Sequence, residues 1–367
     1  MRSIDARIFR REGRVVCAFD WVDRGWLEQL CAVRGVSGDE SRVADLVWAL
    51  GRPFIDVGHR DAMGNLILMR HWDRPGPRLV LCAHLDEVGL IITHIDDDGW
   101  LRFEPVGGMD LRLLPGVAVR VGAGGISGVI ASPPIHLVPS TERDQALALD
   151  DLRIDIGASD RAAAERRVEV GDVVCFTRSP MDIGECFAGC ALDDRAGIAA
   201  ILGVLRATRD LALPVAAAFT VQEEIGTRGA AAVAAALQPD VAVVVETTTA
   251  ADLPGVPAHR RVTRLGQGPA ITIQDGGMIA SGDLVRELVA AARMAEVPFQ
   301  WKESVSGGTD GARFARAGGQ SAVVSLPCRY LHAPMGLLYP EDLDQEVRLL
   351  VRWLEDRAAV WERAVNG

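Results

Sequence analysis

Aromatic residues are scarce in this sequence, at 5% of 367 residues, and Ala, Val and Leu carry most of its 49% hydrophobic content. An interior with few aromatic rings suits parallel strands packed against Ala-rich helices, which predicts an α/β fold. The sequence contains no run of about 18 apolar residues, so it predicts no membrane span. Its first residues also lack the apolar stretch of a signal peptide.

Positive charge is also in short supply, because 39 Lys and Arg stand against 50 Asp and Glu, a formal net charge of −11. Nucleic acids and anionic membranes attract basic proteins, so we expect neither as a partner. The seven cysteines form no C-x-x-C pair, and a chain of this length needs no disulfide to fold. We therefore expect a cytoplasmic protein in which Cys186 and Cys190 are packing residues.

The length of the chain allows two domains, and its pattern of apolar residues changes along the sequence. Residues 1–20 form an extension without a clear pattern, and residues 21–89 contain helical and strand-like segments. Residues 90–176 contain short alternating strands separated by Gly and Pro, which is typical of a β-rich domain or barrel. Strands and helices alternate again over residues 177–367. The sequence thus predicts a β-rich domain inserted into an α/β domain.

Ionisable side chains directly follow several of the predicted strands. In an open parallel sheet, the loops beyond the carboxyl ends of the strands form the ligand crevice, so such side chains converge. Asp193 and Asp194 stand instead at the start of a predicted helix. The strand-end residues are His84 and Asp86 after RLVLCA, Glu223 and Glu224 after VAAAFTVQ, Glu246 after VAVVV, and His332 after AVVSLP.

The types of these residues favour a metal centre. Imidazoles and carboxylates together suit Zn²⁺, Co²⁺ and Mn²⁺. Strand alternation puts His84 and Asp86 on one side, so Asp86 could accept the second ring N–H of the histidine. Adjacent side chains diverge, so one of Glu223 and Glu224 could bind metal while the other takes a proton from water. Alone, each residue fits an ordinary structural role, such as a helix cap for Asp193; together they indicate a site.

Seven short motifs occur between about residue 26 and residue 350: AHLDEVG (83–89), GGMD (107–110), ALDDRAG (191–197), QEEIGTRGA (222–230), ETTTAADLPG (246–255), GGTDGA (307–312) and RYLHAP (329–334). In this order they resemble the tetrahedral (TET) family of dinuclear metallo-aminopeptidases. That family includes glutamyl, leucyl and lysyl aminopeptidases, and some members carry an endoglucanase label. The resemblance covers nearly the whole chain except the first 20 or so residues.

The resemblance implies a fold and an assembly. The fold is a three-layer α/β/α metallopeptidase domain with an inserted β-rich dimerisation domain, barrel or PDZ-like, at about residues 90–176. Members of the family assemble from dimers into hollow dodecamers whose active sites face inward. The resemblance therefore implies a homo-oligomer. The composition of the chain does not predict an oligomeric state.

The resemblance also implies roles for the site residues. Its metal ligands are His84 and Glu246 at one divalent ion, Glu224 and His332 at the other, and Asp193 between the two. Glu223 is the general base, Asp86 orients His84, and the Asp193–Asp194 peptide is cis. The family often has aspartate where this chain has Glu246. The longer glutamate side chain changes how far the carboxylate extends from the backbone, but the carboxylate itself is kept.

The activity that the resemblance implies is removal of the first residue from short peptides with a free N-terminus. One alternative is a deacylase or another hydrolase on the same metal centre. A glycosidase would keep its activity after chelation, and a silent metal-binding scaffold is expected to have lost part of the constellation. The sequence contains no G-x-S-x-G elbow at a strand end and no P-loop or dinucleotide motif, so we expect no nucleotide cofactor. Arg329 could neutralise an acidic substrate side chain or be structural, which leaves the side-chain preference open.

Overall fold

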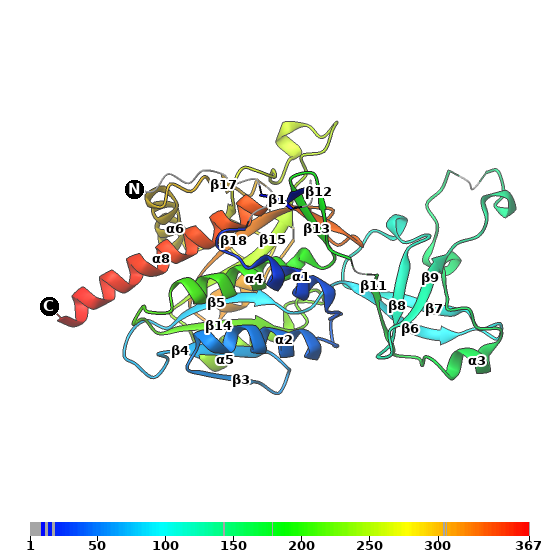
Figure 1. Cartoon of the computed structure of the whole chain (residues 1–367), viewed down its shortest axis with the longest axis horizontal. Helices are drawn as coiled ribbons and strands as arrows, with labels where there is room; N and C mark the ends of the chain where they lie inside the picture. Colours follow the sequence, from blue (N-terminus) through cyan, green and yellow to red (C-terminus); the bar gives the residue numbers. More distant parts are fainter. Residues whose placement is uncertain are drawn as a thin grey trace.

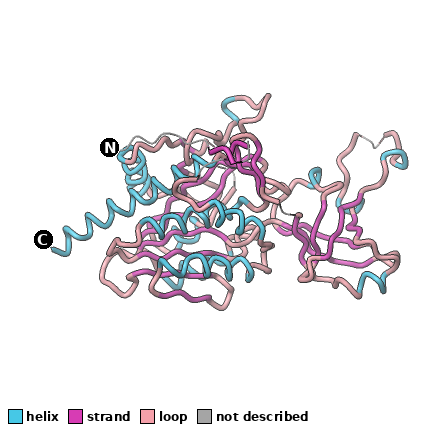
Figure 2. Tube along the Cα trace, in the orientation of Figure 1, coloured by secondary structure: helices cyan, strands magenta, loops and turns pink. Residues whose placement is uncertain are grey.

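The computed structural model consists of two parts, shown in Figure 1. The larger part is a β-sheet between two layers of helices, and the smaller part is a barrel projecting from one end. Figure 2 shows that strands and loops dominate the smaller part, with little helix. This arrangement confirms the predicted α/β/α domain with a β-rich insertion. The structure describes residues 9–11, 14–16, 19–141, 144–177, 179–303, 305 and 307–366.

Four parallel strands form the centre of the sheet, and their side chains are buried almost throughout. Their apolar runs explain this position, because a central strand is covered by helices on both faces. In spatial order they are β18 (Gln320–Arg329), β15 (Val241–Thr249), β5 (Leu79–His84) and β14 (Val215–Thr220).

Antiparallel strands flank this centre on both sides. Beyond β14 lie β4 (Leu66–Arg70) and β3 (Val57–Arg60), and beyond β18 lie β19 (Gly336–Leu338), β13 (Cys186–Gly189) and β12 (Met181–Ile183). The short strands β16 (Ala270–Thr272) and β17 (Gln300–Trp301) pair beside β18.

The strand before Glu246 is longer than the sequence predicted. We expected it over residues 241–245, whereas β15 continues to Thr249 because it pairs with β18 along its whole length. Glu246 therefore lies inside a central strand and not directly after it. His84 also belongs to a strand, since it is the last residue of β5.

Helices cover both faces of the sheet (Figure 1). Helix α4 is buried over most of its length, because it lies between the sheet strands β5 and β15 and the helices α1 and α8. No helix in the described part of the chain is both long and apolar enough to cross a membrane. The helices are α1 (Arg24–Ala32), α2 (Ser41–Gly51), α4 (Leu192–Ala207), α5 (Arg228–Leu237), α6 (Gly282–Met294), α7 (Gly311–Arg316) and α8 (Pro340–Asn366). Short 3₁₀ turns lie at Arg52–Phe54, Leu111–Leu113, Ile135–Leu137, Leu149–Asp151 and Ala258–Arg260.

The smaller part is a closed barrel with the strand order β10-β7-β6-β11-β8-β9. Its alternating strands bury a separate core that includes Leu90, Phe103 and Ile154. Of the two forms that the resemblance implied, the structure has the barrel. Its elements are β6 (Gly89–Ile95), β7 (Leu101–Val106), β8 (Ala118–Val121), β9 (Ile126–Ala131), β10 (Arg153–Asp155), β11 (Val173–Phe176) and the short helix α3 (Arg161–Glu165).

Part of the predicted N-terminal extension, residues 1–20, has a defined structure. Strands β1 (Phe9–Arg11) and β2 (Arg14–Val16) form a hairpin, and the rest of the first 18 residues lies outside the described part. The backbone N–H groups of residues 20–22 donate hydrogen bonds of 2.5, 2.9 and 3.1 Å to the carboxylate of Asp344. The chain is thereby tied to helix α8 where the extension ends.

Helix α8 carries a buried carboxyl group, that of Glu346. The side chain is 0% exposed, and neither carboxyl oxygen has a hydrogen-bond partner among the described residues. Burial, together with the nearby charges of Asp342 and Glu246, raises the pKa of Glu346 well above 4.5. Because the folded pKa exceeds the unfolded one, this group lowers the stability of the fold progressively as the pH rises above about 4.5.

We expect Glu346→Met to raise the free energy of unfolding near pH 8 by about 1–3 kcal/mol, the cost of a buried unpaired polar group. The decline in stability between about pH 5 and pH 8 should also become flatter. Thermal unfolding at both pH values measures the change. The matched control is Glu355→Met, because Glu355 is exposed on the same helix. A lower midpoint near pH 8 for the Glu346 variant would contradict the prediction.

Candidate metal centre

The strand-end side chains meet at the carboxyl edge of the parallel strands, next to the barrel. His84, Asp193 and Glu246 form one group of metal-ligand type, and Asp193, Glu224 and His332 form a second. Within each group, one ligand atom from every residue lies within 4.8 Å of the others. The two groups share Asp193, so the structure brings together all five residues that were predicted as metal ligands.

Neighbouring strands position the first group. Strand β15 pairs with β5 and sets Val244 beside Cys82, so two residues further on the strands reach Glu246 and His84. His84 Nε2 lies 3.6 Å from Glu246 Oε2 and 3.1 Å from Asp193 Oδ1. Asp193 enters from the start of α4, and its peptide bond to the next residue is cis, as the resemblance implied.

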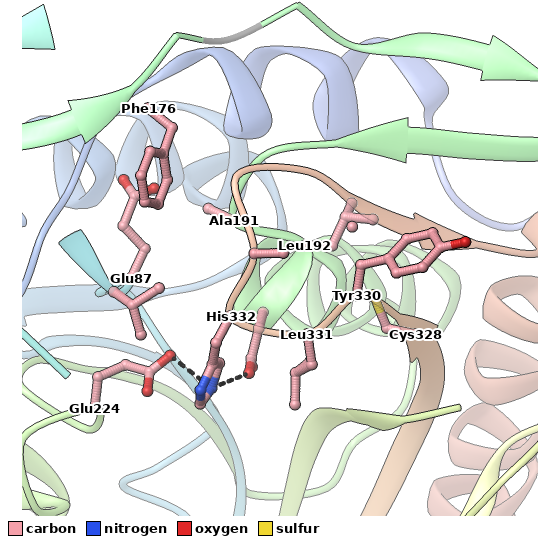
Figure 3. A pocket seen from close by; sticks show the side chains of 13 residues that line it. Glu87, Phe176, Ala191, Leu192, Glu224, Cys328, Tyr330, Leu331 and His332 are labelled. Atoms are coloured by element: carbon pink, nitrogen blue, oxygen red, sulfur yellow. Dashed lines mark ion pairs between the residues drawn. The ribbon is translucent and has the colours of Figure 1, made fainter. Parts of the chain in front are cut away.

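Two loops position the second group. His332 follows β18 in a loop, and Glu224 lies between β14 and α5. His332 Nε2 lies 3.2 Å from Asp193 Oδ2 and 3.3 Å from Glu224 Oε1. Figure 3 shows the imidazole of His332 with the carboxylate of Glu224 pointing toward it. The two loops that carry Glu224 and His332 lie more than 100 residues apart in the sequence.

Asp86 connects the two groups in a way that the sequence did not reveal. Its backbone oxygen lies 3.0 Å from Nδ1 of His84, and its carboxylate oxygen Oδ1 lies 3.5 Å from the same nitrogen. The carboxylate accepts hydrogen bonds from the backbone N–H groups of Glu223, at 2.9 Å, and Glu224, at 3.1 Å. It also accepts one of 2.6 Å from the hydroxyl of Ser37. Asp86 therefore holds the glutamate loop as well as facing the histidine ring.

Ser37 itself was missed, because the sequence G-V-S-G indicated only a turn. A serine in a short turn that contains glycine has no chemical signature of a site. Its partner is separated from it by 49 residues and is recognisable only in three dimensions.

Buried carboxyl groups crowd this site. Burial, followed by the charge of Glu246, raises the pKa of Glu223 well above its usual value. Burial and the charge of Asp193 raise the pKa of Glu224 to about 8. Burial opposes ionisation of Asp193 as well, but hydrogen bonds from His332 and His84 lower its pKa. Nearby cations would relieve this repulsion, since they favour the charged form of each carboxyl group.

One buried atom also fits a bound cation. Oε1 of Glu224 is buried and makes no hydrogen bond to any described residue, although it lies near His332. A carboxylate oxygen in that position needs a partner, because leaving it unpaired is costly. The nitrogen and oxygen donors around it are those that Zn²⁺, Co²⁺ and Mn²⁺ accept. The residues present therefore fit divalent metal ions.

A cavity of 480 Å³ opens onto both groups. Glu223, which is a member of neither group, lines it. The walls away from the two groups come from the end of β15, from Val262 and Lys302, and from the GGTDGA segment. The lining in these walls includes Thr247, Thr248, Thr249, Val262, Lys302, Gly307, Gly308 and Thr309.

The barrel reaches this centre through two glycines after β7, Gly107 and Gly108. Gly107 has φ +83°, and a Cβ atom there would lie 2.8 Å from Val88 Cγ1 and 3.3 Å from Glu224 Cβ. At Gly108 a Cβ atom would lie 3.9 Å from His332 Nδ1. Sequence reasoning used the GGMD motif only for its resemblance, because glycines carry no chemistry of their own. At Gly107 this close approach and the positive φ require the absence of a side chain, whereas at Gly108 a Cβ atom would make only an ordinary contact.

We expect Gly107→Ala to lower kcat/KM by about 10-fold, because the added methyl group strains the backbone and displaces Glu224. The matched control is Gly116→Ala. Gly116 has φ +80°, but nothing lies within 4 Å of the added Cβ. Steady-state kinetics of both variants measure the difference, and equal losses in the two would show that backbone strain alone is responsible.

A sheet of the α/β/α type, with two ligand groups sharing an aspartate beyond its parallel strands, is the arrangement of a metallopeptidase. Residues 64–349 match the family model of the M42 glutamyl aminopeptidases, and this chain belongs to that family. The putative aminopeptidase FrvX of Escherichia coli (strain K12) is 34% identical over 335 residues, 88% of this chain and 92% of FrvX. The lysyl aminopeptidase of Pyrococcus furiosus is 31% identical over 345 residues, 91% of this chain and 97% of that protein.

Solved structures agree in fold. A TET aminopeptidase from the marine sediment archaeon Thaumarchaeota archaeon SCGC AB-539-E09 has a TM-score of 0.86 and 32% identity, and the match covers 91% of this chain and 97% of that one. The TET1 peptidase of Pyrococcus horikoshii can assemble into a tetrahedron or a large octahedral shell. It has a TM-score of 0.78 and 34% identity, with 89% of this chain and 98% of that chain covered. The protein is therefore a peptide hydrolase of the aminopeptidase type, as the motifs indicated.

Proposed function

We propose that the protein removes the first residue of short peptides by means of two divalent cations, Zn²⁺, Co²⁺ or Mn²⁺. His84, Asp193 and Glu246 would hold one cation, and Asp193, Glu224 and His332 the other. The observation that carries this proposal is the shared Asp193, whose two carboxylate oxygens face different histidines at 3.1 and 3.2 Å. A carboxylate used on both sides suits a pair of cations better than a single ion.

When bound, the cations supply Lewis acidity to the scissile carbonyl and lower the pKa of water. Glu223 takes the proton from the attacking water and delivers it to the departing amine. Burial raises its pKa well above the usual value for glutamate, and a raised pKa suits a carboxyl group that must both accept and donate a proton. Asp86 keeps this glutamate in place through the hydrogen bond from its backbone N–H.

We also propose that different segments of the chain have separate roles in catalysis and assembly. Residues 21–89 and 177–367 would form the catalytic domain, and residues 90–176 would mediate dimerisation, with dimers assembling into a dodecamer. The assembly of the Pyrococcus horikoshii TET1 peptidase supports this proposal. Light scattering coupled to gel filtration tests it, and a monomer at micromolar concentration would contradict it. A reducing, cytoplasmic location is also proposed, since no disulfide joins any two of the six described cysteines.

The test of the activity is hydrolysis of unblocked aminoacyl amides beside their N-acetylated copies. Each is assayed after chelation and after addition of Zn²⁺, Co²⁺ or Mn²⁺. We expect cleavage of the free-amine substrates alone, lost on chelation and restored by metal. Equal cleavage of the acetylated copies would instead favour a deacylase on the same centre, and activity that survives chelation would rule out the metal proposal.

A further inference from the structure

A second cavity, of 510 Å³, lies where the barrel meets the α/β/α domain. Its lining comes from the end of α1 and the turn after it, from α2, and from β8, β11 and the loop between β8 and β9. We call it the arginine groove, because Arg34, Arg42 and Arg120 line it. The other lining residues are Ala32, Val33, Ala123, Gly124, Gly125, Cys175, Phe176 and Thr177.

The arginine groove concentrates positive charge on an acidic protein. Its described lining contains three arginines and no aspartate or glutamate, whereas the chain as a whole has a net charge of −11. The carboxylate of Asp39 lies outside this lining and places its Oδ2 3.8 Å from Nε of Arg34. An anion is therefore attracted to this groove although the protein as a whole repels it.

The three guanidinium groups converge on the loop between β8 and β9. Arg34 donates hydrogen bonds to two backbone carbonyls of this loop, one of them that of Ala123 at 3.1 Å. Arg42 donates a hydrogen bond of 3.3 Å to the same carbonyl of Ala123. Arg120 donates one of 3.4 Å to the carbonyl of Gly125. Three cations are thus gathered around one short loop.

Several N–H donors of these side chains remain for a ligand. A guanidinium group has five N–H donors. The Nε atom of Arg34 is buried and makes no hydrogen bond to a described residue, and the whole side chain is only 11% exposed. Arg42 uses only Nη2, and Arg120 only Nη1, for hydrogen bonds to described residues. A buried donor without an acceptor is costly, so a bound acceptor would be favourable here.

We propose that the arginine groove binds a phosphate group, either free or carried by a small molecule. A phosphate ester has a charge of about −1.5 to −2 near neutral pH and three acceptor oxygens, so it can accept from guanidinium groups on several sides. The volume of the groove lies within the range of about 300–1,000 Å³ that is typical of small-molecule sites. The groove shares no lining residue with the two metal-ligand groups, and the inference does not rest on the proposed activity.

The arginine groove adjoins the metal centre in two ways. Phe176, at the end of β11, lines the groove and also lines the cavity drawn in Figure 3, beside the second ligand group. Arg34 precedes the turn in which the hydroxyl of Ser37 donates a hydrogen bond to Asp86. Because Arg120 belongs to the barrel and Arg34 to the α/β/α domain, a bound phosphate would hold the two parts together. Binding should therefore slow hydrogen exchange on both sides of the groove.

The experiment is calorimetric titration of the full-length protein with inorganic phosphate, glycerol 3-phosphate and AMP. Each titration is run on the metal-loaded protein and again after chelation, because phosphates also bind metal ions. We expect a saturable site that remains after chelation. Arg42→Gln and Arg120→Gln should each weaken binding about 10- to 100-fold, the loss of one charged hydrogen bond. Arg34 is left unchanged, since it holds the loop between β8 and β9. The matched control is Arg52→Gln, an exposed arginine just beyond α2.

A gain in affinity is expected for Asp39→Asn, because this change removes a carboxylate that competes for Arg34. A folding defect would not produce tighter binding, and unfolding curves identify any variant that misfolds. Equal affinities for the three compounds would assign the groove to free phosphate, and tighter binding of the two esters would assign it to phosphate esters. No binding after chelation, or binding that Arg42→Gln and Arg120→Gln leave unchanged, would overturn the inference. Exchange protection confined to the metal-ligand loops would overturn it as well.

Discussion

Glu223→Gln is expected to lower kcat by about 10²–10⁴-fold, the usual contribution of a general acid–base group. Glutamine keeps the size of the side chain but cannot take a proton from water. Metal content should stay unchanged, because Glu223 lines the cavity without belonging to either ligand group. The backbone N–H of residue 223 also keeps its hydrogen bond to Asp86, so the loop should not move. Single-turnover kinetics and metal analysis measure the two quantities.

The matched control for this variant is Glu362→Gln, the same chemical change at an exposed position on α8. It should leave both kcat and metal content unchanged. Turnover of Glu223→Gln within a few-fold of wild type would remove Glu223 from the role of base. A large loss of bound metal would instead assign it to the ligands.

Asp193→Asn is expected to have the second large effect, a fall in kcat/KM of at least about 10³-fold with loss of bound metal. Asp193 is the residue common to both groups, so its replacement weakens two sites at once. Changing an outer partner of a ligand typically costs about 10- to 100-fold, and we expect loss of a shared ligand to exceed that. Metal analysis after dialysis and kinetics in added Zn²⁺ measure the effect.

The neighbouring Asp194 provides a matched control with the same chemical change. Its carboxylate accepts hydrogen bonds from the backbone N–H groups of His84, at 3.3 Å, and Gly197, at 3.0 Å. Asparagine keeps one of these two acceptor oxygens, and Asp194 belongs to neither ligand group. Asp194→Asn should therefore retain metal and lose much less activity. Equal effects of the two variants would contradict the assignment of Asp193 as the shared ligand.

The two parts of the molecule are coupled at this centre. The barrel has its own core, yet Gly107 and Gly108 bring it against Glu224 and His332. A shift of the barrel relative to the sheet would therefore displace the residues of the second ligand group first. This gives the inserted part a role in shaping the site in addition to the proposed role in dimerisation.

The sequence by itself determined the class of fold and indicated which ionisable residues would converge on one site. Apolar runs and alternation are local patterns, so the central strands, the helices between them and the β-rich insertion could be predicted from them. The chemistry of His84, Glu246 and His332 is also local, because residue type limits what each side chain can bind. Their position after predicted strands was enough to indicate convergence, since parallel strands end at one edge of a sheet.

Only the tertiary structure decided how these residues are held and which charged side chains reach the cavity. The carboxylate of Asp86 meets the backbone of Glu223 from 137 positions away, and Arg329 meets Asp252 across 77. No local pattern encodes such pairs, because they depend on strand register and loop paths that arise as the whole chain packs. The same holds for Lys302, an ordinary charge in the sequence that the pairing of β16 and β17 brings to the cavity.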